Sequence, residues 1–185
     1  MVLGGVEKEL ITIIKKMSPD EYDITIVLFY ISDIEIMKQI PSHVKVIVFG
    51  IDKKYYCASL ATMCKERIKR GHLREAAVLL LKRLLRIGTT HSNANISQIP
   101  SVDHSYDVAV CFHIHSPIVL RYVAERVTAI KKIAWIHNDF FTTRYPIRRL
   151  KKYLNSYQEI IAVSDSVQHE FIKLCPEYSR IAYVE

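Results

Sequence analysis

Short runs of β-branched and aromatic residues alternate along the chain with amphipathic runs. The first amphipathic run, residues 6–17, has apolar side chains at helical spacing and predicts a helix. The apolar runs predict strands at residues 23–30, 44–49, 107–112, 133–136, 159–163 and 181–185, and most of these strands are separated by predicted helices. Alternation of this kind predicts an α/β fold, a three-layer Rossmann-like domain with a mostly parallel sheet.

The stretch KKIAWIHND, residues 131–139, ends a predicted strand in three polar residues, His137, Asn138 and Asp139. In an open α/β sheet, ligands bind outside the carboxyl ends of the strands. A histidine one residue past a buried strand is therefore a candidate reacting group. A loop histidine that only caps a helix or bonds a backbone carbonyl is the structural alternative.

A second pair of histidines, His113 and His115, comes after the predicted strand 107–112. Two histidines at this spacing could bind a metal ion, but no third ligand is near them in the sequence. We therefore expect no metal site, and we expect one of the two rings to face the cleft at the end of the strand.

Two helix starts are candidate anion-binding elements. Gly4 and Gly5 open the first predicted helix, and glycines there let backbone N–H groups approach a ligand at the positive end of the helix dipole. A plain turn is the alternative for this pair. Ser164 and Ser166 flank Asp165 at the start of a helix predicted to run to Leu174, and helix capping alone also explains a serine there.

Residues 55–87 interrupt the alternation with two predicted helices on either side of Gly71. The second has an apolar face and a largely basic opposite face. Either it is a core helix with a solvated basic back, or the pair is an interfacial element attracted to anionic lipid.

Composition narrows the class of protein. The chain has 185 residues, half of them hydrophobic, which suffices for one core, and we expect residues 1–185 to form a single domain with a helical insertion at about 55–87. No apolar run reaches the roughly 18 residues of a membrane span, and no signal peptide is evident, so we expect a cytoplasmic protein. The formal net charge of +7 favours an anionic partner such as nucleic acid, phospholipid headgroups or a phosphorylated substrate.

Four segments together resemble the N-terminal domain of a family 4 glycosyltransferase of the two-domain GT-B fold. The segments are GGVEK at 4–8, YDVAV at 106–110, KKIAWIHND at 131–139 and IIAVSDSVQHEFIKL at 160–174. The resemblance implies transfer of a sugar, of hexosyltransferase type, from a nucleotide-sugar to a polysaccharide or lipid-linked acceptor, with retention and with neither metal nor cofactor. It implies that this half of the enzyme mostly binds the acceptor.

The resemblance also suggests roles for individual residues. It implies that His137 contacts the transferred sugar, that Gly4 and Gly5 face the donor phosphates, and that Ser164 and Ser166 form a hydroxyl-bearing turn. The remaining acceptor-cleft candidates are His113, His115, Asn138 and Asp139.

The chain departs from the family pattern in two ways that bear on its activity. A first strand before Gly4 is short or missing, and no donor-binding domain is present, so we expect this chain alone to transfer no sugar. A half-enzyme that acts with a separate donor-binding chain is one alternative. A non-catalytic basic module is another, although no aromatic stacking platform for nucleic acid is evident and we expect none to bind. We also expect peripheral contact with the inner face of an anionic membrane.

Overall fold

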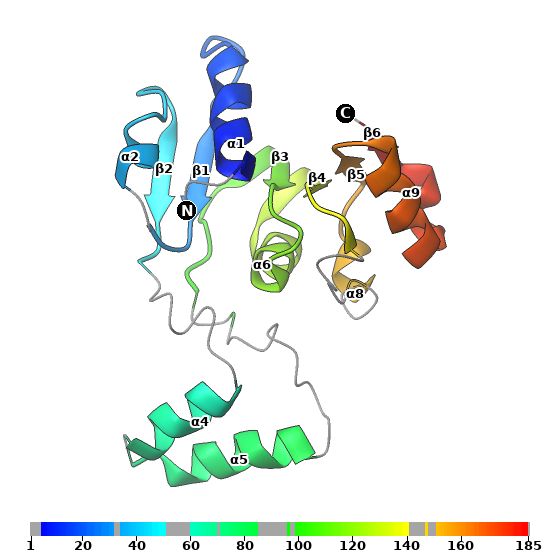
Figure 1. The fold of residues 1–185 in the computed structure, drawn as a ribbon. Coiled ribbons are helices and arrows are strands. Elements are labelled where there is room, and N and C mark those ends of the chain that lie inside the picture. Colours follow the sequence, from blue (N-terminus) through cyan, green and yellow to red (C-terminus); the bar gives the residue numbers. More distant parts are fainter. Residues whose placement is uncertain are drawn as a thin grey trace. The chain divides into compact units, whose positions relative to one another are not determined.

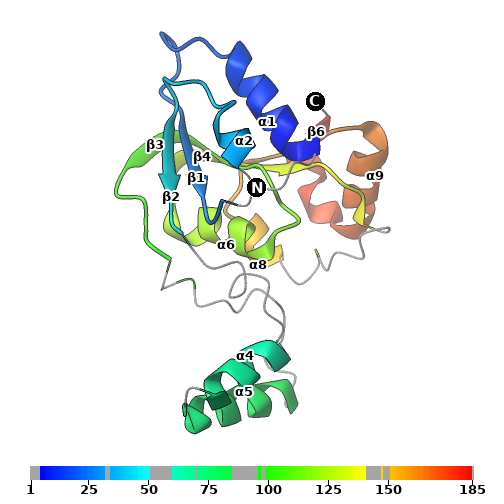
Figure 2. The same ribbon diagram turned by 60° about the vertical axis from the view of Figure 1, so that its left-hand side comes forward.

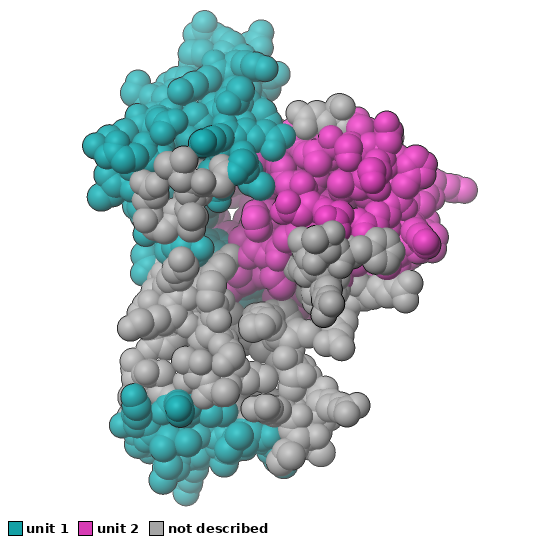
Figure 3. Space-filling model, viewed as in Figure 1, with its two compact units in different colours: residues 1–100 teal, residues 101–185 magenta. Residues whose placement is uncertain are grey.

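The computed structural model describes residues 5–31, 34–50, 60–69, 71–84, 96, 99–140, 147 and 151–184 (Figure 1). The chain divides into two compact units, Met1–Pro100 and Ser101–Glu185, which Figure 3 shows in different colours. Each unit is described by itself.

The first unit contains a short parallel sheet covered by a helix. Strands β1 (Thr25–Leu28) and β2 (Lys45–Val48) pair in parallel, from Thr25 opposite Lys45 to Leu28 opposite Val48. Helices α1 (Gly5–Lys16) and α2 (Ile34–Met37) alternate with them. Ile14, Ile26, Leu28 and Val44 form a buried cluster. The predicted helices and strands of this region are confirmed, although each strand is shorter than its apolar run.

Two further helices, α4 (Leu60–Lys69) and α5 (Leu73–Leu84), pack against each other in the same unit. Gly71 joins them with a φ of 79°, which an L side chain adopts only at a cost. The Gly71 N–H donates to Ile68 O at 3.0 Å and the His72 N–H to Arg67 O at 2.8 Å, which is the Schellman pattern that ends a helix. The prediction of two helices flanking Gly71 is confirmed, and residues 55–59 and 85–87 lie outside the described part.

The second unit contains a four-stranded parallel sheet in the order β3-β4-β5-β6. The strands are β3 (Ser105–Cys111), β4 (Thr128–Ile136), β5 (Glu159–Ala162) and β6 (Ala182–Val184). All three strand pairs are parallel. Together with the β1-β2 pair, this confirms the predicted class, an α/β Rossmann-like fold with parallel sheets.

Three helices connect these strands: α6 (Pro117–Arg126), α8 (Lys151–Leu154) and α9 (Asp165–Leu174). Helix α6 packs on β3, β4 and α8, and α9 packs on β5, β6 and the 3-10 helix Pro176–Ile181 (Figure 2). Right-handed crossovers between strands that are consecutive across the sheet place such helices on the same face.

The face of the sheet beneath these helices forms the core of the second unit. The strand register aligns Cys111, Ala134, Ile160 and Ala182 in one row across all four strands, and none of them is more than 5% exposed. Tyr122 and Phe171 are buried on the helices above. Because side chains alternate between the two faces of a strand, a slip of one residue in the strand pairing would move all the buried apolar side chains of that strand to the other face.

Several boundaries differ from the sequence prediction. Strand β4 begins at Thr128, not Ile133, because Lys131 and Lys132 can join the sheet when their charges find partners: Lys131 Nζ pairs with Glu159 at 2.6 Å, and Lys132 Nζ donates to Ala124 O at 2.9 Å. The basic run RRLKKYLNSY, residues 148–157, has helical spacing, and the structure describes helix in it at Lys151–Leu154, with a turn at residues 155–157.

The ends of two other predicted elements also shift. Strand β3 starts at Ser105, two residues before the predicted start at Asp107. The last strand is limited to Ala182–Val184 because Pro176 opens a 3-10 helix that runs to Ile181. The residues 88–105 are rich in Thr, Ser, Asn and His, which predicts a loop, and most of them lie outside the described residues, as does most of the aromatic segment 140–145.

The hydroxyl of Tyr157, in the turn before β5, donates a hydrogen bond to Leu120 O of α6 at 2.7 Å in the buried interior. We expect Tyr157→Phe to lower the free energy of unfolding by about 1–2 kcal/mol, because a buried acceptor loses its partner. Urea denaturation measures this. Tyr183→Phe is the matched control: its hydroxyl bonds Arg180 O on the exposed surface, and we expect a change within about 0.5 kcal/mol. Equal effects of the two substitutions would contradict the assignment.

Candidate functional site

The second unit gathers most of the candidate residues at one edge of its sheet. Strands β3, β4 and β5 run parallel, so the residues just beyond their carboxyl ends emerge at the same edge. His113 lies two residues after β3, His137 directly after β4, and Ser164 two residues after β5. The backbone continues the pairing past the strands, because the Val163 N–H donates to Ile136 O at 3.2 Å.

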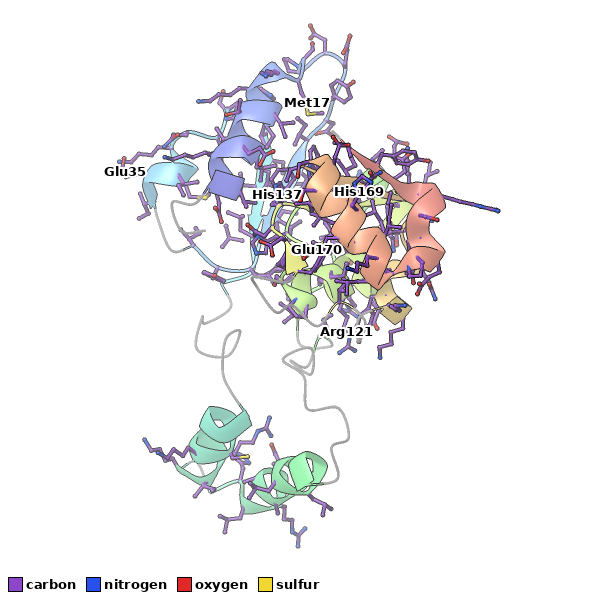
Figure 4. The ribbon with its side chains drawn as sticks, turned by 45° about the vertical axis from the view of Figure 1, so that its right-hand side comes forward. Met17, Glu35, Arg121, His137, His169 and Glu170 are labelled. Atoms are coloured by element: carbon purple, nitrogen blue, oxygen red, sulfur yellow. The ribbon has the colours of Figure 1, made fainter. Side chains whose placement is uncertain are left out.

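His137 lies beside two aromatic rings. The Phe112 ring centroid is 4.6 Å from that of His137, and the Trp135 ring is nearly parallel to the imidazole at 5.9 Å. The His137 side chain is half-buried, with both ring nitrogens inside the protein. Two aromatic neighbours limit the rotation of the imidazole, so His137 has a defined orientation at the end of β4 (Figure 4).

His115 is the electrostatic partner of the other two histidines. Burial, and after it the nearby charges of His113 and His137, lower the pKa of His115 to about 4. A hydrogen bond to the backbone of Asp139 and the charge of the Asp139 carboxyl act in the opposite direction. His115 is therefore neutral near pH 7, and the three predicted histidines and Asp139 share one neighbourhood.

The structure adds two residues that the sequence prediction did not include, Phe140 and Glu170. The Phe140 ring is buried and stacks on His115 with centroids 4.9 Å apart. The Phe140 N–H donates to the Glu170 carboxylate at 2.8 Å, so α9 holds the segment after β4 in place. Figure 4 labels Glu170 on α9. The aromatic residue directly after HND is the only sequence signal for this contact.

The serines after β5 have a structural role. The Ser164 side chain accepts a hydrogen bond from the Val167 N–H at 3.4 Å and caps α9, so the capping interpretation is confirmed for this residue. Ser166 is exposed in the first turn of α9. The Ser164 hydroxyl can still donate to a ligand, because the cap uses it only as an acceptor.

The two remaining polar candidates after β4 differ in accessibility. Asn138 is exposed and Asp139 is half-buried beside His115. Asn138 is therefore the residue of the HND triplet that a dissolved ligand reaches most easily, whereas Asp139 acts on the ring of His115.

The glycine pair belongs to the other unit. Gly4 lies outside the described residues. Gly5 is exposed at the start of α1, and an added Cβ there would meet no atom within 4 Å. The predicted helix start is confirmed, and packing within the described residues does not require a glycine at position 5.

The Cys111 thiol at the end of β3 is buried. Burial raises the pKa of the Cys111 thiol to about 12, so this thiol does not ionise near neutral pH. Among the residues that the structure describes, no three His, Cys, Asp or Glu side chains are grouped to hold a metal ion. Neutral imidazoles can both donate and accept hydrogen bonds.

No helix in the described ranges is long and apolar enough to cross a bilayer. In the comparisons with known proteins, no protein-family model matches the chain, and no curated protein matches it. The resemblance to family 4 glycosyltransferases therefore stays a prediction.

The burial of His115 predicts how the stability of the fold depends on pH. The folded pKa of His115 lies below the ordinary value of 6.5, so the unfolded chain binds a proton before the folded chain does. We expect stability to fall as pH drops from about 6.5 towards 4, and we expect His115→Gln to make that fall shallower. Urea denaturation at several pH values measures both.

An NMR titration of the imidazole signals gives an independent check. We expect His115 to titrate near 4, and we expect His137→Gln to raise its pKa because one positive neighbour is removed. His169→Gln is the matched control: the His169 ring bonds Asp165 O on the exposed side of α9, and the substitution should leave the pKa of His115 unchanged. An ordinary His115 titration near 6.5 would contradict the described burial.

Proposed function

We propose that the chain is the acceptor-binding half of a retaining glycosyltransferase, and that sugar transfer takes place at the edge that carries His137. Within this proposal the enzyme transfers a hexose from a nucleotide-sugar to a polysaccharide or lipid-linked acceptor in the cytoplasm. The observation that carries the proposal is the imidazole of His137, packed against Phe112 and Trp135 at the carboxyl end of a central parallel strand.

The chemistry of such a transfer fits the residues at this edge. A sugar presents hydroxyl groups, which need partners that donate and accept hydrogen bonds. The neutral imidazole of His115 offers both, and the exposed Asn138 side chain offers a carbonyl and an amide. Aromatic rings such as Phe112 offer apolar surface for the C–H faces of a sugar ring.

His137 is the residue that we propose contacts the transferred sugar; both ring nitrogens are buried in the free chain, so the proposal requires that ligand binding uncovers one of them. A fixed hydrogen-bonding group placed where charge develops stabilises a transition state without reorganising. Phe112 and Trp135 restrict the rotation of the His137 ring, and the Glu170 carboxylate holds the backbone of Phe140. Charge on the departing diphosphate would be met by backbone N–H groups at a helix start.

The main test is a substitution of His137 in the native protein. We expect His137→Ala to lower kcat/KM for sugar transfer by 100-fold or more, because the loss of one fixed transition-state donor costs about 10²–10³ in rate. Uridine, guanosine and thymidine diphosphate sugars labelled in the sugar serve as donors, and membranes from the source cells supply the acceptor. Incorporated label is the measurement.

The control for this test is His169→Ala, which removes an exposed imidazole on α9 whose ring bonds Asp165 O. It should transfer sugar at the unchanged rate. Full activity of His137→Ala, with circular dichroism showing that both variants fold, would refute the role of His137. No transfer from any donor, even with cell extract that can supply a donor-binding chain, would refute the proposed reaction.

The same assay distinguishes an acceptor-binding half, which needs a donor-binding partner, from an enzyme that acts without one. We expect the purified 185-residue chain to incorporate no label by itself, because the proposal assigns most donor contacts to a second domain. Activity that returns when cell extract is added would indicate a separate donor-binding chain. Turnover by the isolated chain would contradict the assignment of an acceptor-binding half.

A further inference from the structure

The α4–α5 helical hairpin exposes more apolar surface than a core element would. Leu73, Ala77, Leu80 and Leu81 have the i, i+4, i+7, i+8 spacing of one helical face, and all four are exposed. Leu73 is 64% exposed and Leu81 is 55% exposed. Among the described side chains of the predicted apolar face, Leu73, Ala77 and Leu80 are exposed and Ala76 is buried.

The contact between the two helices is made at Ala76, which lies next to Leu73 and Leu80 on α5. Ala76 is buried, and its carbonyl accepts a weak hydrogen bond from the Cys64 thiol at 3.9 Å. Arg67 of α4 forms an ion pair with Glu75 of α5. These pairs hold the two helices together, while Leu73 and Leu80 stay exposed beside Ala76.

Helical spacing shows which exposed residues share a surface. Lys65 and Lys69 are each two positions from Arg67, and two positions on a helix place side chains nearly opposite each other. Leu73 and Ala77 are each two positions from Glu75, so they too lie opposite the Arg67–Glu75 pair. The exposed leucines of α5 and the exposed lysines of α4 therefore lie on the same side of the hairpin.

The charge of the hairpin selects among partners. Residues 60–84 contain seven lysines and arginines against two glutamates. A second copy of the same face would bring like charges together. Nucleic acid would meet the lysines but would leave the leucines in water. A bilayer with anionic lipids satisfies both sets, since apolar side chains enter the acyl boundary while lysines meet the headgroups.

We propose that the α4–α5 hairpin docks on the surface of a membrane that contains anionic lipid, with the leucine face of α5 inserted and Lys65 and Lys69 at the headgroups. Hydrophobic residues beside basic ones give an attachment that depends on both salt and lipid charge. This docking does not depend on the proposed sugar transfer, because it uses neither His137 nor any donor.

Co-sedimentation with vesicles tests the docking directly. The full chain is mixed with vesicles of phosphatidylcholine alone, or of phosphatidylcholine with phosphatidylglycerol. We expect binding to the anionic vesicles only, and we expect added salt to weaken it because the Debye length shortens. The combined variant Leu73→Ser and Leu81→Ser should lower the partition coefficient at least about tenfold. Ile130→Ser, at an 80% exposed position on β4, is the matched control and should bind unchanged.

A charge variant keeps the test decisive if the serine variant unfolds. Lys65→Gln with Lys69→Gln should lower partition at low salt by about fivefold for each charge removed. Lys8→Gln with Lys15→Gln has the same net charge but changes exposed lysines of α1, and it should bind like the parent chain. Equal losses in the two charge variants would overturn the proposal, since net charge alone would then explain binding.

Two other outcomes would also overturn it. A dimer that dissociates in the serine variant, in a chain that binds no vesicles, would assign the face to a second copy. Salt-sensitive binding to RNA or DNA without binding to anionic vesicles would assign the lysines to nucleic acid.

Discussion

The candidate site depends on one constraint, the parallel register of β3, β4 and β5. The row formed by Cys111, Ala134 and Ile160 is fully buried, so none of these strands can slip without exposing its apolar residues. Parallel strands in fixed register bring the residues beyond their carboxyl ends to a single edge. His113, His137 and Ser164 are far apart in sequence, and this register alone brings the segments that carry them together.

Rigidity at that edge comes from aromatic and carboxylate contacts around the histidines. The rings of Phe112 and Trp135 lie against His137, Phe140 stacks on His115, and Glu170 holds the backbone of Phe140. Crowding among the three imidazoles, together with burial, keeps His115 neutral at physiological pH. An edge that combines the neutral imidazole of His115 with other hydrogen-bonding groups and aromatic surface suits a ligand rich in hydroxyl groups, which is the physical basis for proposing a sugar as substrate.

The sequence was sufficient for the fold class and for the order of its elements, because apolar runs of β-branched residues and the glycine between two helices are local signals. It was insufficient where distant partners decide. Lys131 and Lys132 resemble the end of a loop, but Glu159 and the Ala124 carbonyl stabilise them within β4. His137 is evident from its place after a strand, whereas Phe140 and Glu170 are not, because their contact joins residues 30 positions apart. The apolar face of α5 is evident in the periodicity, but its exposure is not.

Chemical-shift mapping by NMR tests the central claim, that ligands bind at the carboxyl edge of the β3-β4-β5-β6 sheet. The chain is titrated with nucleotide-sugars and with simple glycosides as acceptor probes. The account predicts that backbone signals of residues 112–116, 137–140 and 164–167 shift together, with the imidazoles of His137 and His115 among them. Shifts confined to the opposite edge, at residues 102–106 and 128–131, would contradict it.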